Sequence, residues 1–357
     1  MTHPTINKIL IIGPSWIGDM VMAQSLFIAL KADNPTVIID VLALAWTKPL
    51  LDRMPEVNQA IPMPVSHGVF AWGLRKKIGV TLQQNKYDQA IVLPNSWKSA
   101  LIPWFAKIPL RTGWRGEMRY GLLNDIRKLD KLALPMMVQR YVSLAYPSSQ
   151  SHIAPSYPAP LMVANPIVSK LIPELKPNQK RLILCPGAEF GPAKQWPAKH
   201  YAQVANQLIQ QGWQVIILGS QADRTIASEI TSTIPSEQAH SSFNLCGKTE
   251  LQDAIDLLAT ADIVISNDSG LMHITAALHT PLVAIYGPTS PDFTPPLADN
   301  AQIVQLEVDC GPCFQRTCPK QHHQCMKNIN SEQVINLIQQ MNTTTLGTDI
   351  SDGPDQQ

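Results

Sequence analysis

Two loops far apart in the chain each follow a short apolar run and lead into a helical pattern. The first is residues 13–20, after the run 9–12, and the second is residues 266–273, after the run 263–265. The amino end of a helix carries partial positive charge and favours anions such as phosphate. One such loop in each half predicts two nucleotide-type domains that face a common cleft. An acid in the first loop, with an acid, a hydroxyl and a histidine in the second, indicates group transfer on a phosphate-bearing substrate.

Short apolar runs alternate with amphipathic patterns through both halves of the 357-residue chain. This alternation predicts α/β domains, each a doubly wound parallel sheet with helices on both faces. Seven prolines between residues 147 and 178 interrupt regular structure and mark a boundary. We therefore expect domains at 1–160 and 161–342, with a last helix at 331–341 and a disordered tail at 343–357. The expected strands are 8–12, 37–44, 90–93, 181–185, 214–218, 262–266 and 281–286.

The composition, 45% hydrophobic and 15% charged, suits globular domains with sizeable cores. The net charge of +1 argues against a general nucleic-acid binder. Residues 1–160 hold 17 basic and 9 acidic side chains, a balance of +8, which leaves −7 for residues 161–357. A basic half favours an anionic partner. A chance division of charge between two solvated surfaces is the alternative.

No apolar run reaches the roughly 18 residues that span a bilayer. The amino-terminal residues lack the charged and apolar pattern of a signal peptide. We therefore expect a cytoplasmic protein whose six cysteines are reduced.

Asp19 stands at the start of a helix after a strand, where doubly wound sheets bind their ligands. A carboxylate in that place can take a proton from an attacking hydroxyl. Capping of its own helix is an equally good interpretation of the position. The loop does not match the G-x-G-x-x-G pattern, so a dinucleotide site is not supported.

Three polar groups of the second loop, Asp268, Ser269 and His273, converge on one helix end, where Gly270 allows close approach to a phosphate. An ordinary helix cap is the alternative. Lys194 ends the small-residue loop 185–194, and a cation there can neutralise a departing diphosphate. A solvent-exposed loop lysine is the alternative. The G-x-x-x-x-G-K-[ST] pattern is missing, which excludes a P-loop.

A basic stretch with interleaved aromatic residues runs from residue 97 to residue 140. Arginine binds carboxylates and phosphates through two parallel hydrogen bonds. We interpret the stretch as a docking face for an anionic substrate, at a membrane surface. Nucleic acid is the rival partner, which the acidic second half disfavours. The basic residues are Lys98, Arg111, Arg115, Arg119, Arg127, Lys128, Lys131 and Arg140.

Four cysteines and two histidines fall in one short segment, and its first cysteine pair has C-x-x-C spacing. This spacing is typical of metal and redox sites. A structural zinc ion and an iron–sulfur cluster are both candidates, while reduced thiols or disulfides formed on isolation are the alternative. Because the segment is far in sequence from the two loops, we expect any role to be structural. The cysteines are Cys310, Cys313, Cys318 and Cys325.

Taken together, the motifs between residues 8 and 300 resemble the ADP-heptose:lipopolysaccharide heptosyltransferases of Gram-negative bacteria, most of all the heptosyltransferase II branch. The matching segments are GPSWIGDM at 13–20, LPNS at 93–96, RTGWRGEMRYGLLND at 111–125, CPGAEFGPAK at 185–194, NDSGLMH at 267–273 and YGPTSP at 286–291.

This resemblance implies a GT-B glycosyltransferase, with two Rossmann-like domains facing a central cleft. The amino-terminal domain would bind the acceptor and the carboxy-terminal domain ADP-heptose, with Asp19 in the place of the family's proposed base. The cysteine segment is a departure from some relatives. The positions that match the family's donor site are Lys194, Thr249, Asp268, Ser269, Gly270 and His273.

We expect an inverting single displacement, in which Asp19 deprotonates a hydroxyl of heptosyl-Kdo2-lipid A and the oxygen attacks ADP-heptose. Lys194 would stabilise the leaving diphosphate without a metal. The enzyme is expected to act peripherally at the cytoplasmic face of the inner membrane. The alternatives are the sister enzyme that adds the first heptose, another GT-B nucleotide-sugar enzyme such as an epimerase, and a non-catalytic binder. The expected acceptor contacts are Lys98, Arg111, Arg115 and Arg119.

Overall fold

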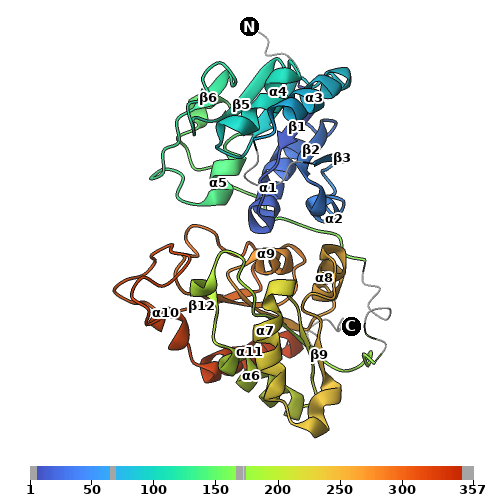
Figure 1. Cartoon of the computed structure of the whole chain (residues 1–357), viewed down its shortest axis with the longest axis vertical. Coiled ribbons are helices and arrows are strands. Elements are labelled where there is room, and N and C mark those ends of the chain that lie inside the picture. The colour runs from blue at the N-terminus through green and yellow to red at the C-terminus, as the bar shows by residue number, and fades with distance from the viewer. Residues whose placement is uncertain (1–5, 65–69, 166–171, 173, 348–357) are drawn as a thin grey trace, which may run out of the picture. The chain divides into compact units, whose positions relative to one another are not determined.

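The computed structural model describes residues 6–64, 70–165, 172 and 174–347, and the side chains only as far as residue 342 (Figure 1). The chain forms two compact units. The first comprises Met1–Ala164 and Asp292–Leu297, and the second comprises Asn165–Pro291 and Ala298–Gln357. The break after residue 164 lies within the proline-rich stretch. The return of residues 292–297 to the first unit is a feature that the sequence did not predict.

The first unit contains a sheet of six parallel strands in the order β3-β2-β1-β4-β5-β6. This is the strand order of Rossmann-type sheets, in which the order reverses between the first and fourth strands and ligands bind at the carboxyl edge there. The strands are β1 (Lys8–Ile12), β2 (Ile38–Leu44), β3 (Gln59–Met63), β4 (Gln89–Val92), β5 (Leu110–Trp114) and β6 (Asp125–Arg127).

Both faces of this sheet are covered. Successive side chains of a strand point to opposite faces, and the side chains of β1 are buried on both. Leu10 and Ile12 of β1 join a core with residues of two later helices, while Ile9 and Ile11 are equally buried. The unbroken apolar run of β1 is typical of such a central strand. The helices are α1 (Ile17–Asp33), α2 (Lys48–Leu51), α3 (Trp72–Leu82), α4 (Leu101–Phe105) and α5 (Met137–Val142).

The second unit repeats the topology with six parallel strands in the order β9-β8-β7-β10-β11-β12. The order again reverses between its first and fourth strands, β7 and β10. The strands are β7 (Arg181–Cys185), β8 (Gln214–Ile217), β9 (Ser242–Asn244), β10 (Ile263–Asn267), β11 (Leu282–Tyr286) and β12 (Ala301–Gln305).

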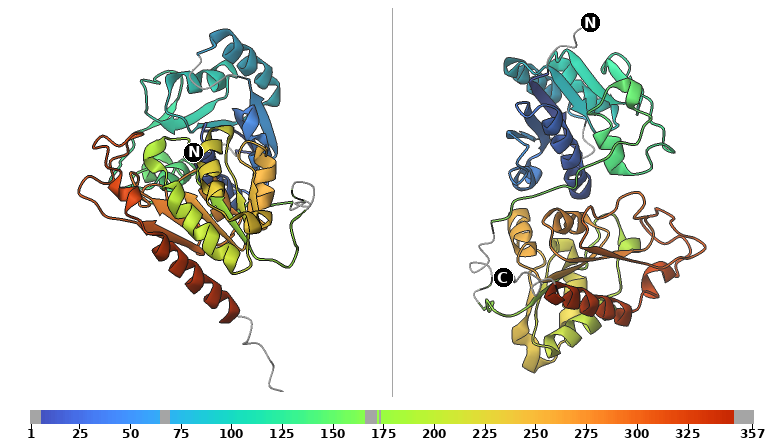
Figure 2. Two further views of the ribbon diagram at one scale, coloured as in Figure 1. Left: turned by 60° about the horizontal axis from the view of Figure 1, so that its bottom comes forward. Right: turned by 180° about the vertical axis from the view of Figure 1, so that it is seen from behind.

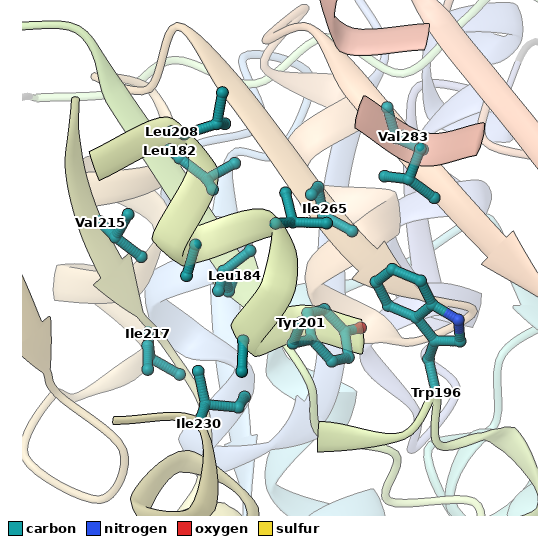
Figure 3. Packing of buried hydrophobic residues seen from close by; sticks show 14 of the residues in the cluster. Leu182, Leu184, Trp196, Tyr201, Leu208, Val215, Ile217, Ile230, Ile265 and Val283 are labelled. Atoms are coloured by element: carbon teal, nitrogen blue, oxygen red, sulfur yellow. The ribbon is translucent and has the colours of Figure 1, made fainter. Parts of the chain in front are cut away.

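The core of the second unit lies between its sheet and the helices on one face (Figures 2 and 3). Trp196 and Tyr201 pack there edge to face, with ring centroids 4.8 Å apart, beside the strand residues Leu184 and Ile265 (Figure 3). The helices are α6 (Ala198–Gln210), α7 (Arg224–Ser232), α8 (Leu251–Leu258), α9 (Gly270–Ala277), α10 (Gln324–Lys327) and α11 (Ser331–Gly347).

The last helix corrects one expectation, since α11 continues to Gly347 and residues 343–347 are therefore helical. Glycine ends helices readily, and no earlier residue of this segment breaks the pattern. The rest of the predicted disordered tail, residues 348–357, lies outside the described residues. In the part of the chain that the structure describes, every helix is too short or too polar to cross a membrane.

Candidate functional site

The first loop joins β1 to α1 and is shaped by close backbone packing. A Cβ atom at Gly13 would lie 2.6 Å from Met20 Cε and 3.2 Å from Ala43 Cβ, so a larger residue here would displace the end of the Met20 side chain. The Gly13 N–H donates to Leu42 O at 2.9 Å, which extends the sheet by one residue before the turn. Asp19 follows in the first turn of α1 and is half-buried. A carboxylate in this place is stabilised by the amino end of the helix.

Asp19 has a partner that sequence reasoning missed. Helix α5 packs along α1, and the buried hydroxyl of Tyr141 hydrogen-bonds to the Asp19 side chain. Burial raises the pKa of Tyr141 well above its usual range, and the negative charge of Asp19 acts in the same direction. The phenol therefore stays protonated and donates to the carboxylate. Only the packing of two distant helices creates this pair, and no sequence motif indicates it.

The second loop joins β10 to α9 and is fastened to the loop that follows β7. Asn267 Nδ2 donates to Pro186 O at 2.7 Å, and Asn267 Oδ1 accepts from the Trp196 N–H at 3.1 Å. Ser269 occupies the N-cap position of α9 without a capping hydrogen bond from its side chain, and its hydroxyl lies 3.1 Å from that of Ser266. This helix end lies at the carboxyl edge of the sheet, beside the point where the strand order reverses. Such a place is favourable for an anion.

Lys194 and Asp268 form an ion pair at this edge. Lys194 Nζ lies 2.6 Å from Asp268 Oδ2, with the two side chains 12% and 5% exposed. Thr289, from the loop after β11, donates to the same carboxylate oxygen at 2.6 Å. The ammonium group also lies 4.8 Å from the centroid of the Phe190 ring. Asp268 is thus enclosed and neutralised, and it holds Lys194 in one place.

His273 lies on α9 one turn after Ser269 and is 5% exposed. Burial lowers its pKa to about 4, with the carboxylate of Asp268 acting against this shift and the charge of Lys194 adding to it. The imidazole is therefore neutral at neutral pH. It offers a hydrogen bond but no positive charge to a ligand at this edge.

Thr249 is half-buried in the connection between β9 and α8, immediately before Glu250, which caps that helix. Because all six strands are parallel, this connection lies at the same carboxyl edge as the loops after β7 and β10. It is, however, at the outer strand of the sheet, separated from β7 by β8. The sequence-predicted donor residues thus share one edge without forming one contact cluster.

The basic stretch divides into arginines that hold the fold and residues that reach solvent. Arg119 is fully buried, donates to Pro94 O at 2.6 Å and to Trp114 O, and has its pKa lowered to about 10 by burial. Arg111 donates to Leu122 O at 2.6 Å and to Ile108 O at 2.5 Å. Both arginines thus support the loop around residue 116 through hydrogen bonds to backbone carbonyls.

Two further arginines of this stretch are structural. Arg127 is buried and pairs with Asp125 at 2.7 Å, while Arg140 donates to Leu134 O at 2.9 Å and lies over the Phe293 ring. By contrast, Arg115 is exposed and Lys98 is half-buried. The spacing of basic residues did not distinguish these two classes, because burial depends on the three-dimensional packing.

The four clustered cysteines are partly exposed and free. Cys310 Sγ lies 3.8 Å from His322 Nε2. The pKa of Cys325 is raised mainly by burial and, to a smaller extent, by negative charge on the other three cysteines. The four sulfur atoms therefore lie near one another. Among the described residues, however, no three His, Cys, Asp or Glu side chains are arranged to hold a metal ion. The described residues therefore give no support to the zinc or iron–sulfur site that the spacing suggested.

The cysteine segment is not remote from the loops, although it is far from them in sequence. The Ala193 N–H donates to Arg316 O at 3.1 Å, and the Phe314 N–H donates to Pro288 O at 2.7 Å. The segment thus binds the loop that carries Lys194 and the loop that carries Thr289. Distance in sequence is therefore no guide to distance in the fold here, because strands β7, β10 and β11 are neighbours in the sheet.

Comparison with known proteins gives extensive matches. The model of glycosyltransferase family 9 (heptosyltransferase) matches residues 75–324. The chain is 50% identical over 335 residues to lipopolysaccharide heptosyltransferase 2 of Salmonella typhimurium, covering 92% of this chain and 96% of that protein. It is 47% identical over 347 residues to lipooligosaccharide heptosyltransferase 2 of Haemophilus influenzae, covering 94% and 99%.

A solved structure agrees with these matches. The structure of E. coli ADP-heptose lps heptosyltransferase II superposes with a TM-score of 0.86 and 46% identity, covering 95% of this chain and 99% of that chain. The similarity extends through both units. The chain belongs to glycosyltransferase family 9, the heptosyltransferases.

Proposed function

We propose that this chain transfers a heptose from ADP-heptose to the first heptose of the lipopolysaccharide inner core. The observation that carries the proposal is the 50% identity, over nearly the whole length of both chains, to a protein named lipopolysaccharide heptosyltransferase 2. That match favours this activity over the sister enzyme that adds the first heptose. It also favours transfer over an epimerase or a non-catalytic binder, since the matched relatives are named as transferases.

Asp19 is the base in this proposal. Its half-buried carboxylate lies in the first turn of α1, and Tyr141 occupies part of its hydrogen-bonding capacity. The Asp19 carboxylate accepts the proton of the acceptor hydroxyl as that oxygen attacks the anomeric carbon of ADP-heptose. The attack comes from the side opposite to ADP, so the reaction inverts the configuration. The transition state has oxocarbenium character, as in other glycosyl transfers.

The donor is bound at the carboxyl edge of the second sheet. Lys194 and the amino end of α9, with Ser269 and Gly270, stabilise the diphosphate as negative charge develops on it. Asp268 keeps Lys194 in position through the 2.6 Å ion pair, and neutral His273 donates or accepts a hydrogen bond. Thr249, at the outer strand, contacts the adenine. These assignments use the position of each residue at one edge of the sheet.

The acceptor carries acidic sugars and phosphates, so cations of the first unit attract it. Exposed Arg115 and half-buried Lys98 are the residues of the basic stretch that we propose for direct contact. Arg111 and Arg119 contribute indirectly, because their guanidinium groups hold the backbone of the loop that carries Arg115.

The transfer as proposed uses no metal, and Lys194 and the amino end of α9 contribute positive charge beside the diphosphate. The cysteine segment takes no part in the chemistry through a bound ion. Metal analysis of protein purified without chelator tests this point. One equivalent of zinc or iron whose removal abolishes transfer would contradict it.

The decisive experiment is product mass after the protein is mixed with ADP-heptose and heptosyl-Kdo2-lipid A. We expect a gain of one heptose, with ADP released only when acceptor is present. A gain on heptose-free Kdo2-lipid A alone would make the chain the preceding enzyme of the pathway. ADP-heptose consumption without acceptor would indicate a different nucleotide-sugar activity.

We further propose that the enzyme works peripherally at the cytoplasmic face of the inner membrane, through an aromatic patch of the first unit. The patch consists of Phe70, Trp72, Trp97 and Trp104, which are 36–48% exposed. The Trp72 and Trp97 rings stack with centroids 6.4 Å apart, and Phe70 lies 6.0 Å from Trp72. Tryptophan favours the level of lipid headgroups.

Charge around the aromatic patch matches an anionic bilayer. Residues 70–107 include six basic side chains, of which Arg75 is buried, and a single acid. Basic residues near a surface attract anionic lipids. We expect the full chain to sediment with phosphatidylglycerol vesicles but not with phosphatidylcholine vesicles. The Trp72→Ser/Trp104→Ser variant should lose this binding, while Trp46→Ser, at a tryptophan 48% exposed elsewhere in the unit, should keep it. Equal sedimentation of both variants would refute the role of the patch.

A further inference from the structure

The cysteine segment between β12 and α10 is built against the loop that carries Lys194. The backbone of Arg316 forms the contact: its carbonyl accepts the Ala193 N–H at 3.1 Å. A Cβ atom at Gly191 would lie 2.4 Å from that same carbonyl oxygen, so the two backbones approach as closely as glycine allows. The position of Arg316 relative to this loop is therefore fixed by backbone packing.

The side chain of Arg316 extends to the same aromatic ring as Lys194. Arg316 Cζ lies 5.4 Å from the Phe190 centroid, and Lys194 Nζ lies 4.8 Å from it. Because both are measured from one centroid, the two cationic groups are at most about 10 Å apart. Both cations thus contact Phe190, at the edge of the sheet where the donor is proposed to bind.

A nucleotide diphosphate bound at this edge of the sheet needs a second positive charge besides that of Lys194. Lys194 is already neutralised by Asp268 at 2.6 Å. His273 adds no charge at neutral pH, since burial lowers its pKa to about 4, and α9 contributes only a partial charge. Arg316 is exposed, and within the described residues it has no ion-pair partner. Each phosphate of a nucleotide diphosphate sugar carries a negative charge, so Lys194 alone leaves this ligand poorly matched.

We propose that Arg316 is a donor-binding residue, whose guanidinium binds the diphosphate of ADP-heptose beside Lys194. The inference rests on the proposed function, because it takes the edge near Lys194 as the donor site. The planar guanidinium presents paired N–H donors to phosphate oxygens, which is the geometry that phosphate binding favours. The cysteine segment then has a role in substrate binding: it presents Arg316 to the Lys194 loop.

The test is binding of ADP and of adenosine to the full chain by titration calorimetry, with transfer kinetics alongside. Arg316→Gln should weaken ADP binding about tenfold, as loss of one charge-assisted contact predicts, and raise the KM for ADP-heptose more than it lowers kcat. Adenosine binding should not change, because adenosine has no phosphate. Arg316→Lys should recover part of the loss, and Lys320→Gln, in the same segment and equally exposed, should behave as wild type.

The outcomes separate this inference from the proposed function. If Lys194→Ala weakens ADP binding and Arg316→Gln does not, the donor site stands and the role of Arg316 is wrong. Equal weakening of ADP and adenosine by Arg316→Gln would also overturn it, because that pattern indicates a structural role. If neither variant alters ADP binding, the donor does not bind at this edge of the second sheet, and that part of the proposed function is wrong.

Discussion

The loops after β1 and β10 share a local design, a strand followed by a helix with an aspartate near its start, yet their aspartates are in opposite environments. Asp268 is 5% exposed and takes Lys194 and Thr289 on one oxygen, both at 2.6 Å. Asp19 is half-buried and hydrogen-bonded to Tyr141, a neutral partner. An enclosed carboxylate in an ion pair is a poor proton acceptor. A carboxylate that is hydrogen-bonded to a neutral donor and partly exposed keeps its negative charge and can be reached by a substrate hydroxyl.

The two loops also occupy different places in the same topology. The Asp19 loop follows the first strand of its sheet, while the Asp268 loop follows the fourth strand of the other. In the second unit the first-strand loop, after β7, carries Lys194 instead. Related sheets thus place different chemistry at corresponding edges: a carboxylate in the first unit and a cation held by a carboxylate in the second.

The comparison is tested most strongly by making the same substitution in both loops. Asp19→Asn should lower kcat about 10³-fold, since general-base catalysis contributes on the order of 10²–10⁴, and should leave ADP affinity unchanged. Asp268→Asn should instead weaken ADP binding, because Lys194 loses the partner that positions it. Initial rates and calorimetry on both variants measure this contrast.

The matched control is Asp33→Asn, an exposed aspartate at the other end of α1. It should behave as wild type. If Asp19→Asn retains near wild-type kcat while folded, the assignment of the base is wrong and the difference between the loops has no catalytic meaning.

Removal of the cation in the second unit should have the next largest effect. Lys194→Ala should lower kcat/KM for ADP-heptose by about 10²–10³, the range seen when one charge-stabilising group is lost from an active site. It also leaves Asp268 buried without its ion-pair partner, so the free energy of unfolding should fall as well. Lys199→Ala, an exposed lysine on α6, is the control. Wild-type kinetics in Lys194→Ala would remove Lys194 and the loop after β7 from the donor site.

His273 gives a measurement of how enclosed the second loop is. Its pKa falls from 6.5 to about 4 in the folded protein, so below pH 6.5 the unfolded chain binds a proton that the folded chain does not. The free energy of unfolding should therefore decrease as pH falls from 6.5 to 4, by about 2 kcal/mol at pH 5.

Urea unfolding at several pH values tests this linkage. His273→Gln should show a shallower decrease in this range than wild type, whereas His240→Gln, at an exposed histidine, should not. An unchanged slope in His273→Gln would show that the histidine is protonated in the folded state, and that this edge carries more positive charge than we infer.

The sequence was most informative where the pattern of apolar residues alone decides the secondary structure. The apolar runs at 8–12 and 181–185 are strands with those bounds, since unbroken apolar runs between turns suit buried parallel strands. The less apolar strands β3, β5, β6, β9 and β12 were not among the expected ones. Strand β3, for example, contains Pro62 and is mostly half-buried, so it lacks both an apolar run and a clean alternation.

What the sequence did not predict depends on contacts between distant residues. Arg119 looked like a ligand-binding arginine, but its neighbours Pro94 O and Trp114 O enclose it. Arg316 was not singled out, because only the pairing of β7 with β10 and of β10 with β11 brings its segment to Lys194. Tyr141 was likewise missed, since its contact with Asp19 arises from the packing of α5 on α1.

Tyr141 therefore offers the smallest but most specific test of the first loop. Tyr141→Phe keeps the ring in the core and removes only the hydroxyl that donates to Asp19, so the carboxylate loses a stabilising hydrogen bond. The acid limb of the kcat profile should move to higher pH, with kcat at neutral pH changed by only about three- to tenfold. Tyr120→Phe, at a tyrosine 62% exposed, should leave the profile in place.

A lower rate without a shift of the acid limb would mean that Tyr141 supports α1 by packing alone. In that case the distinction between the two aspartates would rest on the ion pair of Asp268 rather than on the neutral donor beside Asp19.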